Sequence, residues 1–91
     1  MYQIKSYSYK KAKELGVEIK PSTVKNKKID VFKDGKKIAS IGDINYPDYA
    51  SYLEKEGKSV ADERRRLYHL RHQKEKNKIW SPGWLSLKIL W

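Results

Sequence analysis

The 91-residue sequence predicts a small α+β domain: a lysine-rich β-hairpin or short antiparallel sheet packed by two helices, with an apolar aromatic C-terminal segment docked on them. Two patterns support this fold class. The pair Asp34-Gly35 lies between two runs of alternating apolar and polar residues, which is typical of a tight hairpin turn. Apolar residues at helical spacing follow, bounded by Gly57 and Pro82. A chain of this length builds one small core, so residues 1–91 are expected to be a single domain.

The hairpin is predicted to join strands at 28–33 and 36–41. Its second strand does not keep a strict period of two, so a bulge is expected near Ala39-Ser40. An isolated hairpin is barely stable in water. It therefore needs a covering helix or a third strand, for which residues 17–24 are the candidate.

Two helices are predicted after the hairpin. Asp48 suits the first turn of a short helix at 48–56. Ser59 suits the start of a longer helix at 60–76, because Asp62 follows it at the spacing of a capping box.

The two ends of the chain differ in character. Residues 6–15 suit a short helix closed by Gly16, and residues 1–16 are considered as an N-terminal extension. Residues 84–91 carry too many large apolar side chains to be left in water, so we expect them to cover the core and to present an interface to a partner. The predicted partner interface consists of Trp84, Leu87, Leu90 and Trp91.

The chain is strongly basic. It has 21 Lys and Arg against 11 Asp and Glu, a formal net charge of +10. The surplus is greatest in residues 1–37, with eleven lysines against four acidic residues. A field of this sign implies a polyanionic partner, either a nucleic acid or an acidic protein surface.

Lysines interleaved with aromatic residues are typical of sequence-independent nucleic-acid binding. The predicted anion-binding residues are Lys25, Lys27, Lys28, Lys33, Lys36, Lys37, Arg65 and Arg66. The same pattern is equally compatible with a solvated basic surface that faces acidic protein neighbours.

Two arginines of the longer helix, Arg64 and Arg71, fall within its apolar stripe on a helical wheel. We expect both to be partly buried in structural ion pairs with Asp43 and Asp48, or bonded to backbone carbonyls. The alternative is that they form a pair of anion-binding forks in a groove.

No residue pattern predicts an enzyme. Cysteine is absent, and His69 and His72 lack a third ligand at suitable spacing, so both are interpreted as solvated surface residues. Asp48, Glu56 and Lys58 match the letters of a metal-dependent nuclease signature, but one helix would separate the carboxylates by about 12 Å along its axis. We therefore expect no catalytic residues, no metal and no cofactor.

Four blocks of the sequence together resemble a family of small basic proteins of unknown function from large DNA viruses of the nucleocytoplasmic type and some phages. The blocks are KKIDVFKDGKKIASIGD, YPDYASY, DERRRLYHLRH and SPGWLSLKILW, and the likeness spans about residues 17–91. The resemblance implies a viral setting and no particular activity.

The leading functional expectation is a non-enzymatic structural protein of the virion, a minor capsid or internal component that binds and bridges larger viral proteins in an assembly. Such a protein would reside in the virion and in the cytoplasm or nucleus of the infected cell, and would not be secreted. No apolar run is long enough to span a bilayer. The alternative is a sequence-independent DNA- or RNA-binding protein for genome packaging or replication, and a small metal-dependent nuclease ranks third.

Overall fold

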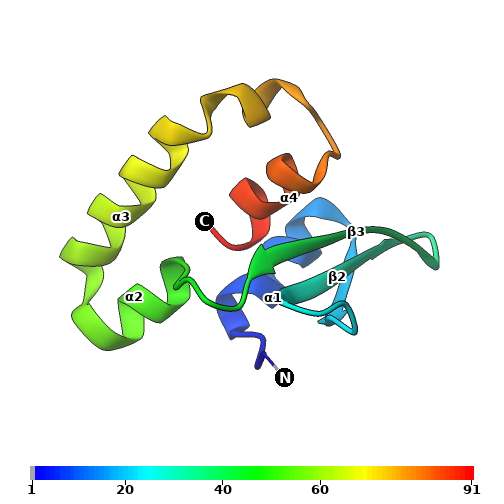
Figure 1. The fold of residues 1–91 in the computed structure, drawn as a ribbon, viewed down its shortest axis with the longest axis horizontal. Coiled ribbons are helices and arrows are strands. Elements are labelled where there is room, and N and C mark those ends of the chain that lie inside the picture. Colours follow the sequence, from blue (N-terminus) through cyan, green and yellow to red (C-terminus); the bar gives the residue numbers. More distant parts are fainter. Residues whose placement is uncertain (1) are drawn as a thin grey trace.

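A three-stranded antiparallel sheet forms one side of the computed structural model, which describes residues 2–91 (Figure 1). Its strands are β1 (Glu18–Pro21), β2 (Lys27–Lys33) and β3 (Lys36–Asp43), in the order β1-β2-β3. The β2–β3 hairpin turns at Asp34 and Gly35, whose φ angles of 53° and 78° are left-handed, as a tight turn requires. The α+β fold class and the third strand are thus confirmed.

The predicted irregularity in β3 is present close to its expected place. Val31 pairs with Ala39, whereas the next residue, Phe32, pairs with Lys37. Ile38 is therefore the extra residue of a bulge, one position earlier than predicted. A bulge of this kind increases the local twist of the hairpin.

Residues 2–91 contain four α-helices and one 3₁₀ turn. They are α1 (Ser6–Leu15), α2 (Tyr49–Glu56), α3 (Lys58–Arg71), η1 (Gln73–Asn77) and α4 (Pro82–Ile89). Helix α1 ends at Gly16 as predicted, with a left-handed φ of 76°. Within this part of the chain, every helix is too short or too polar to cross a membrane.

The longer predicted helix differs from expectation at both ends. Helix α3 begins at Lys58, directly after Gly57, and no side chain caps it. Ser59 therefore lies inside the helix, and the predicted capping box with Asp62 is wrong. Asp62 instead accepts hydrogen bonds from Lys58 Nζ (2.6 Å) and from the hydroxyl of Tyr49 (2.8 Å). At its other end the predicted helix is divided between α3 and η1.

The hydrophobic core lies between the inner face of the sheet, α1 and α4. Its fully buried large side chains include Ile29, Val31, Ile41, Leu85 and Ile89. Ile4 and Ala12 belong to the same cluster, and Ser8 Oγ donates a hydrogen bond to the Ile89 carbonyl (3.0 Å). The N-terminal residues are therefore part of the core, and no separate extension is formed by residues 2–16.

The α2–α3 pair forms an arm beside this core. Figure 1 shows α3 running along the side of the molecule opposite the sheet, with the C-terminal end of the chain between them. The ring of Trp91 stacks on Tyr68 of α3, with centroids 4.3 Å apart and planes 8° from parallel. This contact joins the arm to the segment that follows α4.

Gly42 provides a test of the packing between β3 and α4. A Cβ at this position would lie 2.7 Å from Leu90 Cδ1 and 3.0 Å from Lys28 Cδ, and its φ of +79° is left-handed. Gly42→Ala should therefore lower the free energy of unfolding by about 2–4 kcal/mol, because steric overlap adds to backbone strain. Gly35→Ala is the matched control, since its φ is +78° and nothing lies within 4 Å. The free energy of unfolding of Gly35→Ala should be lower than that of the wild type by about 1 kcal/mol. Equal losses in urea unfolding would contradict the close packing at Gly42.

Candidate functional site

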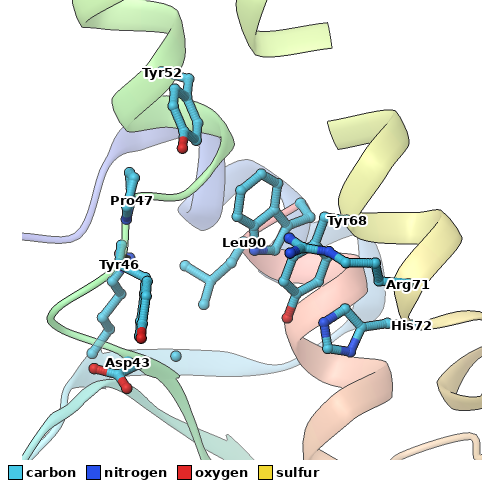
Figure 2. Close-up of a pocket in the computed structure, with 11 residues that line it drawn as sticks. Asp43, Tyr46, Pro47, Tyr52, Tyr68, Arg71, His72 and Leu90 are labelled. Carbon is cyan, nitrogen blue, oxygen red and sulfur yellow. Dashed lines mark hydrogen bonds between the residues drawn. The ribbon is translucent and has the colours of Figure 1, made fainter. Parts of the chain in front are cut away.

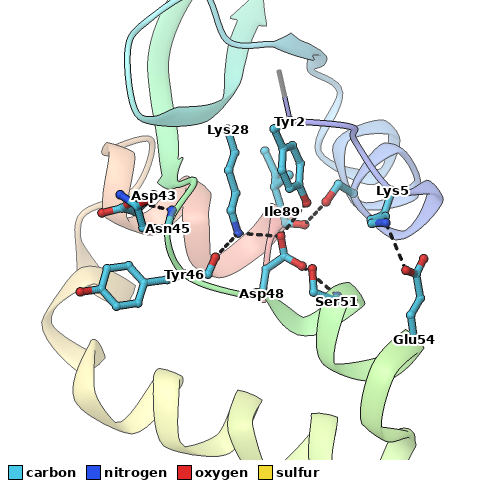
Figure 3. Close-up of polar contacts among 11 residues, drawn as sticks. Tyr2, Lys5, Lys28, Asp43, Asn45, Tyr46, Asp48, Ser51, Glu54 and Ile89 are labelled. Atoms are coloured by element: carbon cyan, nitrogen blue, oxygen red, sulfur yellow. Dashed lines mark hydrogen bonds and ion pairs between the residues drawn. The ribbon is translucent and has the colours of Figure 1, made fainter.

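A buried ion pair lies beneath the loop that joins β3 to α2 (Figure 3). Lys28 Nζ donates to Asp48 Oδ2 (2.9 Å) and to the Tyr46 carbonyl (2.6 Å). Asp48 Oδ2 also accepts from the Tyr2 hydroxyl (2.6 Å), and Oδ1 accepts from the backbone N–H of Ser51 (3.0 Å). The exposed fractions of the Lys28 and Asp48 side chains are only 4% and 2%. The prediction that Lys28 binds external anions is therefore wrong, because its ammonium group is already paired with the internal carboxylate of Asp48.

The electrostatics of this cluster favour the ionised carboxylate. Burial raises the pKa of Asp48, but hydrogen bonds from Tyr2 and Lys28 and the positive charge of Lys28 outweigh burial and hold it below its ordinary value of 3.8. Burial and the hydrogen bond to Asp48 raise the pKa of Tyr2. At neutral pH Tyr2 is thus a neutral donor to a charged acceptor.

The predicted ion pairs of Arg64 and Arg71 are wrong. Both arginines are exposed, and within residues 2–91 neither lies within 4 Å of a carboxylate. Asp43 accepts from the backbone N–H of Asn45 (2.9 Å), and Asp48 pairs with Lys28.

The physical reason is the rotation of α3 about its axis. The predicted stripe spans Leu67 and Val60 at one edge and Tyr68 and Ala61 at the other, with both arginines between them. Only Ala61, at one edge of the stripe, is fully buried, so the middle of the stripe does not face the core. Tyr68 lies on the same side and stacks on Trp91. Arg64 consequently lies over the ring of Tyr52, 5.4 Å from its centroid.

Arg65 and Arg66, both predicted to bind anions, have acidic neighbours on their own helix. Arg65 lies 4.1 Å from the centroid of the Tyr49 ring and donates to Asp62 Oδ1 (3.3 Å). Arg66 forms two hydrogen bonds with Glu63, of 3.1 and 2.6 Å. The two carboxylates of α3 thus pair with Lys58, Arg65 and Arg66, and Arg64 and Arg71 remain without one.

The sheet and its turns carry six accessible lysines that we call the sheet lysines. They are Lys20, Lys25, Lys27, Lys33, Lys36 and Lys37. Within residues 2–91 only Lys37 has a carboxylate within 4 Å, that of Asp30 at 3.7 Å. Lys25 and Lys27 lie at one end of β2. Lys33, Lys36 and Lys37 lie at the other end, at the hairpin turn, about 20 Å away along the strand.

Two aromatic rings accompany the sheet lysines. Lys20 Nζ is 5.1 Å from the centroid of the Phe32 ring, and Lys33 Nζ is 4.5 Å from that of Trp80. Sequence reasoning omitted Lys20 and Trp80. The alternation of strand residues places Lys20 on the same face as Phe32, but no local signal places the 78–81 loop beside Lys33.

Asp30 is the acidic residue of the central strand, β2. Its carboxylate is buried and accepts hydrogen bonds from the hydroxyls of Ser22 and Ser40, both at 2.6 Å. Burial raises the pKa of Asp30, but these hydrogen bonds and that of the Thr23 N–H outweigh it and lower the pKa. The charge of Asp30 is therefore held internally by serine hydroxyls, with Lys37 at its edge.

The predicted partner interface at the C-terminal end is largely internal. Leu87 and Leu90 are only 3% and 2% exposed, so their assignment to that interface is wrong. Trp84 and Trp91 are half-buried and pack against the core cluster. The physical reason is that residues 82–89 form helix α4, which packs against β3, α1 and η1, so its apolar side chains lie in the protein's own core.

A second surface feature, the aromatic cleft, is a cavity of about 540 Å³ between the β3–α2 loop and the end of α3 (Figure 2). Tyr46 and Pro47 line one side, and Tyr68, Arg71 and His72 line the other. Trp91 and Tyr52 extend the aromatic lining, and Asp43 is its exposed carboxylate. The sequence contains no local signal for this cleft, because its residues come from four separate segments.

The two histidines at the end of α3, His69 in its last turn and His72 directly after it, face different surroundings. The ring of His72 stacks on that of Tyr68, with centroids 4.2 Å apart. Burial lowers the pKa of His69, although a hydrogen bond with the Trp91 backbone acts in the opposite direction. Across residues 2–91, no three His, Asp or Glu side chains come together in a group able to hold a metal ion.

Comparison with known proteins gives one match. The model of a family described as "Family of unknown function (DUF5754)" matches residues 17–56, from β1 to the end of α2. The expected likeness to a family of unknown function is confirmed for this segment, and the viral setting remains a prediction. No curated protein and no solved structure matches the chain. The matched segment contains all six sheet lysines, Lys28 and Asp48.

The buried ion pair is expected to be a main source of stability. Lys28→Ala should lower the free energy of unfolding by about 3–5 kcal/mol, because it leaves Asp48 buried without its counter-charge. Lys36→Ala removes an exposed lysine from the same sheet and should change stability by less than about 0.5 kcal/mol. The double variant K28M/D48N should recover part of the loss, since no charge is then stranded. Similar small effects of Lys28→Ala and Lys36→Ala in urea unfolding would exclude a dominant role for the pair.

Acid should weaken the fold in a defined range of pH. The folded pKa of Asp48 lies below 3.8, so the unfolded chain binds the proton more tightly. The stabilisation is fully present above about pH 5 and is lost as the pH falls through the folded pKa. Asp48→Asn should be less stable than the wild type near pH 6, and its stability should decrease less on acidification. Asp34→Asn, in the exposed turn, is the control for replacing an aspartate by asparagine. Urea unfolding at several pH values measures how the free energy of unfolding of each protein changes with pH. The same change with pH in all three proteins would refute this role of Asp48.

Proposed function

We propose that this chain is a non-enzymatic, sequence-independent nucleic-acid-binding protein whose sheet lysines contact phosphate groups. The observation that carries the proposal is the absence of an internal carboxylate partner, within residues 2–91, for five of the six sheet lysines. Uncompensated ammonium groups attract a polyanion and release its condensed counterions.

The spacing of these lysines suits a nucleic-acid backbone. They are spread over about 20 Å along β2, the length of about six base pairs of duplex. The strand register places Lys20 and Lys37 on the face of Phe32, and Lys27 and Lys33 on the opposite face. Phe32 and Trp80 add flat apolar surface beside the charges, on which sugars or unpaired bases can pack. Contact with these rings also restrains Lys20 and Lys33, which lowers the entropy that each loses on binding.

The alternative of a virion structural protein has less support. Its predicted interface included Leu87 and Leu90, and both side chains lie inside the core. A bridging role in a virion remains a prediction, and an acidic protein could also be attracted to the sheet lysines. The nuclease hypothesis is weaker still, because Tyr2, Lys28 and the Ser51 N–H already bind the oxygens of Asp48.

Salt dependence tests the proposal. The triple variant K33Q/K36Q/K37Q should weaken binding to a DNA duplex of about 20 base pairs and reduce the slope of log K against log salt by about 3, since each lost phosphate contact contributes about 0.9. The control K10Q/K13Q/K55Q removes the same charge from exposed lysines of α1 and α2 and should leave most of the slope intact. Fluorescence anisotropy at several salt concentrations measures both.

Two outcomes would contradict the proposal. Equal losses in the two triple variants would mean that net charge alone, and no particular surface, attracts DNA. Absence of binding to DNA and RNA at low salt, together with binding to polyglutamate, would instead identify an acidic protein as the partner.

A further inference from the structure

The aromatic cleft has the size and lining of a ligand site. Its volume of about 540 Å³ lies within the range of small-molecule pockets, about 300–1,000 Å³. Tyr68 is packed between Trp91 and His72, with ring centroids 4.3 and 4.2 Å away, so the wall on α3 is a preformed aromatic stack. A rigid wall of this kind loses little entropy when a flat ligand packs against it.

Tyr46 lies across the cleft from this stack (Figure 2). Its side chain is 68% exposed, and within residues 2–91 its ring packs on no other aromatic ring. Only its backbone is hydrogen-bonded: the N–H donates to the Asp43 carbonyl (3.1 Å), and the carbonyl accepts from Lys28 Nζ (2.6 Å). The faces of the Tyr46 ring are therefore accessible to a planar ligand.

The exposed charged side chains of the cleft are Arg71 and Asp43, and Arg71 is the one that can bind an anionic group. Arg71 lines the cleft and has no carboxylate within 4 Å among the described residues, whereas the charge of Lys28 is compensated by Asp48. A guanidinium presents paired donors that match the geometry of a phosphate group. A nucleotide combines a phosphate, which matches Arg71, with a planar base, which matches the aromatic side chains of the cleft.

The cleft is also adjacent to the sheet lysines. Asp43, one of its lining residues, is the cross-strand neighbour of Lys27 in the β2–β3 ladder. A strand of nucleic acid that leaves the cleft beside Asp43 therefore passes next to Lys27. The base in the cleft must be unpaired, since a paired base remains inside its duplex unless it is flipped out.

We infer that the aromatic cleft binds one unpaired nucleotide of single-stranded DNA or RNA, with the base against Tyr46 and the Tyr68 stack and a phosphate on Arg71. The inference rests on the proposed function and adds a preference for single strands. Stacking of one base on an aromatic side chain corresponds to between about fivefold and a hundredfold in affinity.

The test compares a labelled single strand of about 15 nucleotides with a duplex of the same length by fluorescence anisotropy. Tyr46→Ala and Arg71→Gln alter exposed side chains and should each weaken single-strand binding at least about fivefold, with duplex binding unchanged. Tyr9→Ala, at an exposed tyrosine of α1, is the control and should affect neither ligand. Circular dichroism should show wild-type folding for all three variants.

The outcomes separate this inference from the proposal on which it rests. Wild-type single-strand affinity in Tyr46→Ala and Arg71→Gln, or equal losses for single strand and duplex, would overturn the cleft as a nucleotide site while leaving the sheet lysines in place. A wild-type protein that binds neither ligand at low salt would overturn both.

Discussion

The arrangement of the whole chain depends on the ion pair between Lys28 and Asp48. Burying two charges is unfavourable unless every remaining hydrogen-bonding position is also filled, and here Tyr2, the Tyr46 carbonyl and the Ser51 N–H fill them. These groups come from the N-terminal segment, β2, the β3–α2 loop and the first turn of α2. The pair therefore sets where α2 begins relative to the sheet, and with it the position of the α2–α3 arm and of the aromatic cleft.

The same pairing rules explain where the positive charge of the chain becomes available. On α3 the carboxylates of Asp62 and Glu63 lie within reach of Arg65 and Arg66 and compensate them. In the sheet, the carboxylate of Asp30 is buried and bound chiefly by serine hydroxyls. Among residues 2–91, fourteen of the 21 Lys and Arg side chains have no carboxylate within 4 Å, and five of these are sheet lysines. This group of uncompensated charges on the sheet supports a polyanion as its partner.

The apolar C-terminal segment has a structural role that also shapes a surface. Leu85 and Ile89 fill the space above the sheet, and Trp91 reaches the arm and stacks on Tyr68. Because the ring of Trp91 lies between the core and the α2–α3 arm, a cleft remains between the end of α3 and the loop carrying Tyr46. The preference for unpaired nucleotides that we infer follows from this packing.

The sequence by itself determined the elements whose causes are local: the Asp34-Gly35 turn, the end of α1 at Gly16 and the start of α2 after Asp48 depend on backbone preferences and hydrogen bonds within a few residues. It also indicated most of the sheet lysines, because exposed lysines near a hairpin turn need no tertiary contact to be accessible. Only the tertiary structure decided that Lys28 is buried, since its partner lies 20 residues away. It likewise decided which face of α3 turns inward, because that helix carries apolar groups on two adjacent faces and long-range aromatic packing selects between them.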